Sequence, residues 1–223
     1  MKGKISEIFD SIQGEGIYLG RRQIFVRFFG CNLSCKFCDT PLEYFKEYEP
    51  REVMAEIRKY PPDFHSVSFT GGEPLAQKDF LKALAMLTRE SGIINYLETN
   101  GVLFSELADV IDYCDIIAMD LKLESSTGLK DYREEHRKFL EIAGRKAVFL
   151  KAIICSSTEE ADIRQAVALI EEVNRDVTLC LQPNSFEEGL QLRAKIEKFK
   201  EICAAGFIKV LVIPQMHKVA GVK

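Results

Sequence analysis

Three cysteines close together in the chain are the residues best placed to do chemistry. They are Cys31, Cys35 and Cys38, in the pattern Cys-x3-Cys-x2-Cys. A short loop with this spacing can direct all three sulfurs toward one centre, where thiolates suit soft metals such as iron and zinc. The spacing therefore predicts a metal site.

The number of cysteines in this loop favours iron over zinc. Structural zinc takes four protein ligands, usually as two close pairs, and the sequence contains no second Cys-x2-Cys pair and no His-x3-His pair. A four-iron cluster is normally held by four thiolates, so three would leave one iron open for chemistry. The alternatives are a zinc knuckle and three cysteines that only pack in a core.

With an aromatic residue, Phe37, directly before the third cysteine, the loop resembles the signature of the radical S-adenosylmethionine (SAM) enzymes. The resemblance implies that SAM chelates the open iron through its amino and carboxylate groups. It also implies that one electron splits a sulfur–carbon bond of SAM to give a 5'-deoxyadenosyl radical.

The composition is typical of a globular intracellular protein. The chain has 223 residues, of which 47% are hydrophobic, and a net charge of -4 without a block of like charge. These values give no support to binding of nucleic acid or of a membrane surface, so we expect a small-molecule partner. The absence of a long apolar run and of a signal peptide, with an odd number of cysteines, predicts a cytoplasmic protein. The remaining cysteines lie singly in or beside apolar runs and are expected to pack in the core: Cys114, Cys155, Cys180 and Cys203.

Strand-like and helix-like segments alternate along the chain and must position the cysteine loop. Such alternation is typical of parallel βαβ units, here in one α/β domain over residues 1–223. About seven strands are too few for a closed eightfold barrel, so the candidates are a partial barrel and an open doubly wound sheet. Residues 11–16 are expected to form a loop. Strands are expected at 23–29, 66–69, 94–97, 116–119, 147–154, 177–181 and 208–213, with helices at 51–59, 80–90, 105–111, 134–143, 163–173 and 192–202.

Polar or glycine-rich residues follow nearly every expected strand. In parallel α/β folds the carboxyl ends of the strands lie on one face of the sheet, where active sites form. We therefore predict an active site on this face. It would collect residues 31–38, 70–74, 98–101, 120–122, 182–184 and 214–217.

The segment Thr70-Gly71-Gly72-Glu73-Pro74 follows one of these strands. Glycine lets a ligand approach the main chain closely, and Pro74 can open the next helix because its missing amide hydrogen costs nothing there. Taken alone, the segment could be a simple strand-to-helix turn. Beside the cysteine loop it resembles the second radical SAM signature, which binds the amino group of SAM.

Polar residues of other strands have two interpretations each. Arg27 interrupts an apolar run, so it either pairs with a structural carboxylate or faces a site and binds an anionic ligand. Glu98 and Asn100 could bind a ribose or could form an Asx-type turn with a solvated carboxylate. Asp120 and Lys122 could equally form a surface ion pair, and their role is open.

A closer resemblance spans the chain. Residues 11–16, 25–27 and 30–40 look like the N-terminal signature of the 7-carboxy-7-deazaguanine synthases, and Pro214-Gln215-Met216-His217-Lys218 is similar to that family's ending. The resemblance implies a partial βα barrel of the radical SAM type and a place in the queuosine and deazapurine pathway of tRNA modification. The family converts 6-carboxy-5,6,7,8-tetrahydropterin to 7-carboxy-7-deazaguanine with loss of ammonia, using recycled SAM and Mg2+.

The resemblance also implies roles for individual residues, with the protein mainly positioning its ligands. Thr40 would place a hydroxyl on Mg2+, a hard cation that suits an oxygen ligand. The 4Fe-4S cluster would be held by Cys31, Cys35 and Cys38. The SAM contacts would be Phe37, Cys38, Asp39 and Gly72, to which we add Glu98, Asn100 and Lys122. The pterin contacts would be Ile12, Gln13, Gly14, Arg27, Thr70 and Pro214.

No side chain is expected to act as a general base. His65, His136 and His217 are expected at the surface or in packing, although His217 falls in a matching motif. The family further implies a homodimer and a one-electron donor such as a flavodoxin or ferredoxin.

Two positions depart from the family's pattern. Asp120-Leu121-Lys122 stands where a Ser-Pro-Lys-like stretch is expected and resembles the Asp-Leu-Lys of glycyl-radical activating enzymes, and Arg22 stands near where proline is frequent. The first departure supports a second hypothesis, a radical SAM activase that abstracts hydrogen from a glycine of a partner protein. A third hypothesis is a non-catalytic metal-binding module.

Overall fold

A nine-stranded sheet runs through the computed structural model, which describes residues 1–38, 40, 43–187 and 189–216. The strand order is β3-β1-β2-β4-β5-β6-β7-β8-β9, and from β2 to β9 all neighbouring strands are parallel. Only β1 runs antiparallel to its neighbours, β2 and β3, in the described part of the chain. The strands are β1 (Gly3–Ile12), β2 (Arg22–Phe28), β3 (Lys46–Tyr48), β4 (Ser66–Gly71), β5 (Asn95–Thr99), β6 (Ile116–Asp120), β7 (Ala147–Ile154), β8 (Thr178–Pro183) and β9 (Val210–Val212).

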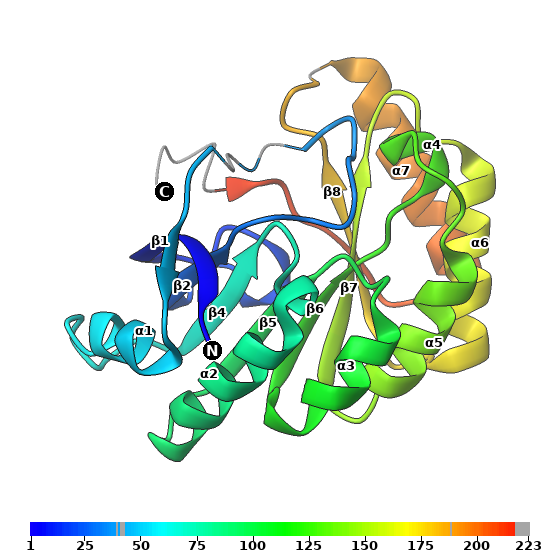
Figure 1. The fold of residues 1–223 in the computed structure, drawn as a ribbon. Coiled ribbons are helices and arrows are strands. Elements are labelled where there is room, and N and C mark those ends of the chain that lie inside the picture. The colour runs from blue at the N-terminus through cyan, green and yellow to red at the C-terminus, as the bar shows by residue number, and fades with distance from the viewer. Residues whose placement is uncertain (39, 41–42, 188, 217–223) are drawn as a thin grey trace.

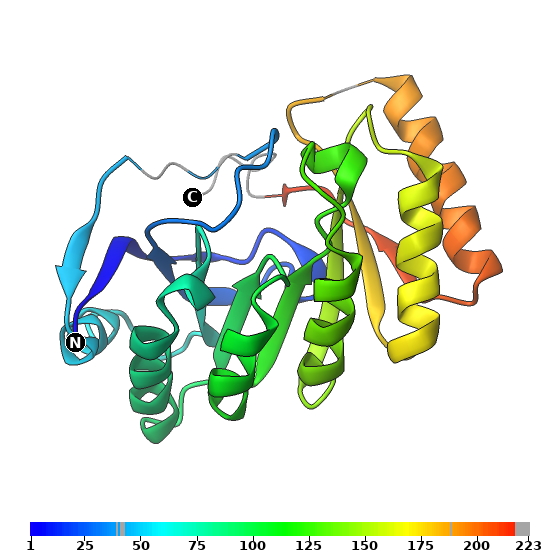
Figure 2. The same cartoon turned by 45° about the vertical axis from the view of Figure 1, so that its right-hand side comes forward.

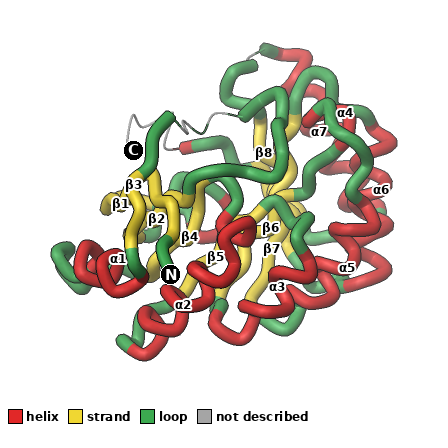
Figure 3. The backbone as a smooth tube through the Cα atoms, in the orientation of Figure 1, coloured by secondary structure: helices red, strands yellow, loops and turns green. Residues whose placement is uncertain are grey.

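Helices follow the parallel strands and cover the outer face of the curved sheet (Figures 1 and 2). The sheet stays open, with β3 and β9 at its edges, so the fold is the expected partial βα barrel (Figure 3). Of the helices in the described segments, none is long and apolar enough to cross a membrane. The helices are α1 (Pro50–Ile57), α2 (Lys78–Glu90), α3 (Phe104–Val110), α4 (Glu124–Thr127), α5 (Arg133–Ala143), α6 (Glu160–Val173) and α7 (Leu190–Ala205), with 3-10 turns η1 (Gly16–Tyr18), η2 (Pro74–Gln77) and η3 (Ile111–Tyr113).

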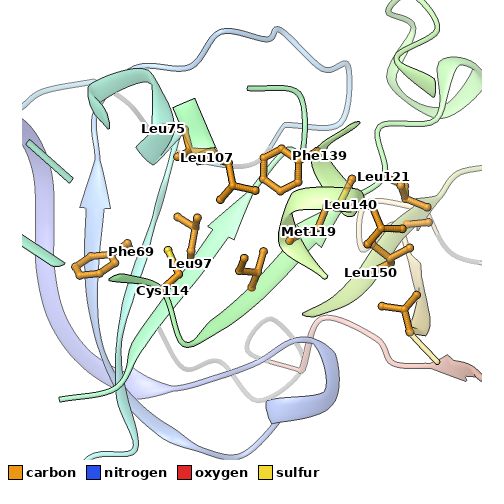
Figure 4. Close-up of a cluster of buried hydrophobic side chains, with 14 of the residues drawn as sticks. Phe69, Leu75, Leu97, Leu107, Cys114, Met119, Leu121, Phe139, Leu140 and Leu150 are labelled. Atoms are coloured by element: carbon orange, nitrogen blue, oxygen red, sulfur yellow. The ribbon is translucent and has the colours of Figure 1, made fainter. Parts of the chain in front are cut away.

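Every second residue of the parallel strands packs into a core between the sheet and the helices. Leu97 of β5, Met119 of β6 and Leu150 of β7 are fully buried there, together with Leu107 of α3 and Phe139 of α5 (Figure 4). Fully burying one such side chain contributes about 1.5–3 kcal/mol. The four single cysteines are buried, as expected for packing residues: Cys114, Cys155, Cys180 and Cys203.

Two strands differ from the sequence-based expectation. β1 and β3 were not expected, and β1 is antiparallel where parallel strands were expected. Ser11 and Ile12 belong to β1, so the expected loop at 11–16 begins only at Gln13. The physical reason is pairing across strands, because Glu7 lies opposite Arg27 in the register and forms an ion pair with it at 3.2 Å. A charged residue such as Glu7 interrupts the apolar pattern by which a strand is recognised in a short sequence window. Its stabilising partner lies twenty positions away, outside that window.

Candidate active site

The strand residues that face away from the helices line one cavity of about 440 Å³. They alternate with the core residues along each strand, as the pleat of a strand requires. Toward the carboxyl ends these residues are mostly polar: Arg27, Thr70, Glu98, Asp120, Lys151 and Gln182. Deeper in the barrel they are mostly apolar and form a separate small cluster: Tyr96, Ile116, Ala118, Phe149 and Cys180. The cavity is therefore polar and rests on an apolar base.

The cavity brings together nearly all residues that were predicted for the site. Of the predicted residues that the structure describes, Pro214 is not on the lining, although its neighbour Gln215 is. Asp39 and His217 lie outside the described residues. The predicted residues on the lining are Ile12, Gln13, Gly14, Arg27, Cys31, Cys35, Phe37, Cys38, Thr40, Thr70, Gly72, Glu98, Asn100 and Lys122.

The cysteine loop follows β2 directly and passes over the carboxyl ends of the strands (Figure 1). Its base is fixed by the backbone of the glycine-rich turn after β4, where the amide of Glu73 donates to the carbonyl of Gly30 at 2.8 Å. A Cβ atom on Gly72 would lie 1.9 Å from the same Gly30 oxygen, so only glycine permits this approach. Farther along, the amide of Lys36 donates to the carbonyl of Thr127 in α4 at 3.1 Å.

The donor set of this loop fits an iron–sulfur cluster. Cys31, Cys35 and Cys38 are free thiols on one cavity lining. Partial shielding from water raises the pKa of the Cys31 and Cys35 thiols, so a bound cation has to hold them as thiolates. Within the described residues no three His, Cys, Asp or Glu side chains are grouped to hold a single metal ion. A four-iron cluster takes each thiolate on a different iron and does not require that convergence.

Glu73 of the glycine-rich turn is fully buried and is not part of the described cavity lining. Its carboxylate accepts hydrogen bonds from the amides of Leu75 at 3.0 Å and Asn100 at 2.8 Å and from the hydroxyl of Thr99 at 3.0 Å. Burial raises the pKa of Glu73 to about 7 despite these hydrogen bonds. The side chain ties the end of β4 to the end of β5.

Four charged side chains form a continuous row along the cavity, which we call the charge row: Glu15, Lys151, Asp120 and Lys122. Lys151 Nζ lies 2.8 Å from Glu15 Oε2 and 3.1 Å from Asp120 Oδ1. Lys122 Nζ lies 2.9 Å from Asp120 Oδ2. Gln215 donates to the other Glu15 oxygen at 2.8 Å. Asp120 and Lys122 thus form the ion pair that the sequence left open, but in the cavity wall, where the Lys122 side chain is only 12% exposed.

The protonation of the charge row follows from this pairing. Burial alone would raise the pKa of Glu15 and of Asp120, but the neighbouring ammonium groups hold both below their usual range. Burial would likewise lower the pKa of Lys122 and of Lys151, but the neighbouring carboxylates hold both above their usual range. All four groups are therefore charged at neutral pH, and their charges cancel.

Glu98 lies on the cavity side of β5 and is not a freely solvated carboxylate. Its Oε1 accepts hydrogen bonds from Gln13 at 2.8 Å and from Ser68 at 3.2 Å, and its Oε2 accepts one from Thr70 at 3.0 Å. Gln13 and Thr70, both predicted pterin contacts, are thus brought to one carboxylate. Their amide and hydroxyl groups are oriented by it toward the same part of the cavity.

Asn100, directly beyond β5, connects the cysteine loop to the strand ends. Its Nδ2 donates to Asn32 Oδ1 at 2.7 Å, and its Oδ1 accepts from the amide of Val102 at 3.1 Å. The second contact is the Asx-type turn that the sequence allowed, so this residue has both a turn role and a position on the cavity.

Arg27 pairs with a structural carboxylate, the first of the two alternatives that the sequence left open, and it also faces the cavity. Its Nε donates to Glu7 at 3.2 Å, and its guanidinium lies 5.5 Å from the ring centre of Phe9. Phe9 in turn stacks on Phe25 at 5.1 Å between ring centres. Arg27 also lines the cavity, where a planar guanidinium suits a carboxylate ligand.

His136 is a packing residue, as expected. It is buried, and its Nε2 lies 3.3 Å from the carbonyl of Asn100. Burial lowers its pKa to about 4, so the imidazole is neutral at physiological pH.

Sequence reasoning missed several residues of the cavity, of which Lys151 is the clearest. Lys151 is a lone charged residue inside the apolar run of β7, just as Arg27 is in β2. The same sequence signal could therefore have identified Lys151 as a site residue. Glu15 lay inside a recognised motif without an assigned role. Gln182 and Gln215 were placed on the correct face but were not assigned to the site.

Comparisons with known proteins agree with this geometry. Residues 25–153 match the family model of the radical SAM superfamily. The chain is 36% identical to the 7-carboxy-7-deazaguanine synthase of Geobacter sulfurreducens, over 98% of this chain and 97% of the relative. It is 35% identical to the 7-carboxy-7-deazaguanine synthase of Archaeoglobus fulgidus over the full length of both chains.

A solved structure shows the same fold. The crystal structure of QueE from Escherichia coli superposes with a TM-score of 0.65 at 22% identity, covering 95% of this chain and 93% of that one. The cysteine loop, the glycine-rich turn and the full-length relatives lead to one assignment. This chain belongs to the radical SAM superfamily and, within it, to the family of the 7-carboxy-7-deazaguanine synthases.

Proposed function

We propose that this protein converts 6-carboxy-5,6,7,8-tetrahydropterin to 7-carboxy-7-deazaguanine with release of ammonia. The observation that carries the proposal is the single cavity that joins three free cysteines to Arg27 and to the Glu98 network. The substrate contains the same atoms as the two products together, so the conversion needs no external oxidant. A recyclable radical source therefore suffices.

The cofactors of the superfamily, a 4Fe-4S cluster and SAM, fit the carboxyl ends of β2, β4, β5 and β6. We assign the cluster to Cys31, Cys35 and Cys38, on the support of their shared cavity lining. When bound, the cluster and SAM supply the 5'-deoxyadenosyl radical that abstracts hydrogen from the substrate. The proposed SAM contacts are Phe37, Cys38, Asp39, Gly72, Glu98, Asn100 and Lys122, of which Asp39 lies outside the described residues.

The protein's own groups bind and orient the substrate. Arg27 is proposed to bind the carboxylate that the pterin carries, because a guanidinium pairs with a carboxylate in a planar geometry. Gln13 and Thr70, which donate to Glu98, are proposed to contact the ring system, with Ile12 and Gly14 on the same wall. Pro214 remains a predicted contact, supported by the position of its neighbour Gln215.

Further partners belong to the same proposal. Thr40 lies on the cavity lining and is proposed to place its hydroxyl on Mg2+. Cys31 and Cys38 are exposed, which supports access for a one-electron donor such as a flavodoxin or ferredoxin. A homodimer is proposed on the family resemblance, and a cytoplasmic location on the odd number of cysteines, which argues for a reducing compartment. The alternative of a glycyl-radical activase is not favoured, because relatives that match nearly the whole chain are 7-carboxy-7-deazaguanine synthases.

The proposal is tested by anaerobic incubation of the iron- and sulfide-reconstituted protein with reductant, SAM, Mg2+ and 6-carboxytetrahydropterin, followed by mass analysis. We expect 7-carboxy-7-deazaguanine from the wild type and none from Cys35→Ala. Cys203→Ala, a buried cysteine remote from the loop, is the matched control and should stay active. Release of 5'-deoxyadenosine and methionine without the deazapurine would refute the pterin assignment and leave the cluster assignment standing.

A further inference from the structure

Gln182 of β8 is a cavity residue whose side chain lacks polar partners. It lines the cavity and is 0% exposed. Neither its Oε1 nor its Nε2 has a hydrogen-bond partner among the described residues. Two other buried carboxamides behave differently, because Gln13 donates to Glu98 and Asn95 donates to the carbonyl of Ala85, both at 2.8 Å.

Leaving this carboxamide without partners is unfavourable for the free protein. A buried polar group without a hydrogen bond lowers a folding or binding equilibrium constant by a factor of about ten to a hundred. Native proteins contain few such groups, and a bound ligand or an ordered water is the usual explanation. In a polar cavity that serves ligands, a missing ligand is the direct explanation.

The position of Gln182 is fixed by the sheet. In the parallel register it lies opposite Ile153 of β7, which also lines the cavity, and its strand neighbour Leu181 is buried on the helix side. The pleat therefore holds Gln182 on the cavity side. The nearby charges are already paired with one another in the charge row, with Lys151 between Glu15 and Asp120.

The chemistry of a carboxamide limits what it can bind. It offers one acceptor oxygen beside two donor hydrogens and carries no charge, so it matches a ligand edge with a donor beside an acceptor. Glutamine and asparagine bind adenine through such a pair of hydrogen bonds. Both proposed ligands have such an edge, the pyrimidine ring of the pterin and the adenine of SAM.

We propose that Gln182 binds the donor–acceptor edge of a bound nitrogen heterocycle and thereby helps to select the ligand. This inference rests on the proposed function for the identity of the two candidate heterocycles. It adds a specificity-determining side chain from β8, on a strand that supplies none of the predicted site residues.

The test compares Gln182→Met, which keeps the side-chain length without the amide, with Cys180→Ala as a matched control. Cys180 lies on the same strand and the same face, fully buried in the apolar cluster below the cavity. Reconstituted wild type and variants are titrated anaerobically with SAM alone and with 6-carboxytetrahydropterin in the presence of SAM. Urea unfolding of each protein without SAM or pterin is measured in parallel.

We expect opposite patterns from the two variants. Gln182→Met should be as stable as the wild type or more stable, because it removes an unsatisfied group, and should bind one ligand about tenfold to a hundredfold more weakly. Cys180→Ala should be less stable and should bind both ligands normally. Weaker SAM binding identifies adenine as the heterocycle, and weaker pterin binding with unchanged SAM binding identifies the pterin.

Unchanged affinity for both ligands in a folded Gln182→Met protein would overturn the inference. A strong loss of stability in both Gln182→Met and Gln182→Leu would also overturn it, because the amide would then have a structural partner. The proposed function fails in a different way. A wild type that binds SAM but not the pterin would refute that function, while the SAM titration would still decide the role of Gln182.

Discussion

Replacing Lys151 by methionine removes the ammonium that lies between two buried carboxylates of the charge row. The Lys151 side chain is only 6% exposed, with Glu15 at 2.8 Å and Asp120 at 3.1 Å. Asp120 keeps Lys122 as a partner in the variant, whereas Glu15 loses the ammonium that holds its pKa down. Breaking a buried pair by removing one partner costs about 3–5 kcal/mol. We expect Lys151→Met to lose stability of that size at neutral pH.

The pH dependence of this loss has a definite sign. In the wild type the pKa of folded Glu15 lies below the ordinary glutamate value of 4.5, so its stabilising contribution is present above that pH and is lost only as the pH falls through the folded pKa. In Lys151→Met, burial without the ammonium raises the pKa of Glu15, so the carboxyl takes up a proton at a higher pH than in the wild type. The difference in stability between the two proteins should therefore shrink as the pH is lowered from neutral.

The assay is equilibrium urea unfolding followed by circular dichroism, at about pH 7 and about pH 5. Lys198→Met is the matched control, because Lys198 pairs with Glu160 while 61% exposed, and exposed pairs contribute only about 0–1 kcal/mol. The double variant Glu15→Gln/Lys151→Met removes the stranded carboxylate, so it should be less destabilised than the sum of its single variants. A loss below about 1 kcal/mol, or one that does not change with pH, would refute this reasoning.

Three further predictions concern the loop and the ligands. Gly72→Ala places a methyl group 1.9 Å from the Gly30 carbonyl, so the reconstituted variant should lose iron content and visible absorption, whereas Gly144→Ala, with 3.3 Å to its nearest neighbour, should keep both. Cys35→Ser should abolish the visible absorption of the reconstituted protein, and a fully coloured variant would contradict the ligand assignment. Arg27→Lys should raise the KM for the pterin about tenfold or more, while SAM binding measured in the same titration stays unchanged, because an ammonium cannot make the planar double contact of a guanidinium.

The order of strands and helices was predictable because the central parallel strands are largely buried on both faces and so read as apolar runs. The runs that contain Leu97, Met119 and Leu150 show this, since each is bounded by turn residues and followed by a helical pattern. β1 was not predictable in the same way, since its Glu7 depends on Arg27 in another strand. The pairing of an antiparallel strand with a distant partner is not visible in a local window.

The candidate site also contains parts that a local sequence window can reveal and parts that it cannot. The cysteine loop and the glycine-rich turn are positioned by their own backbones, through the contact of Glu73 with Gly30 and the close approach of Gly72. Backbone geometry of this kind demands particular residues at neighbouring positions, so it appears in the sequence as a short motif. The charge row is positioned by side chains from three separate segments, and each charge is stable in the cavity only because of the next. Glu15 and Lys151 stand 136 positions apart, so no motif records their contact. The parts that are proposed to hold the cofactor were therefore readable from the chain, whereas much of the wall that is proposed to face the substrate became apparent only once the strands were side by side.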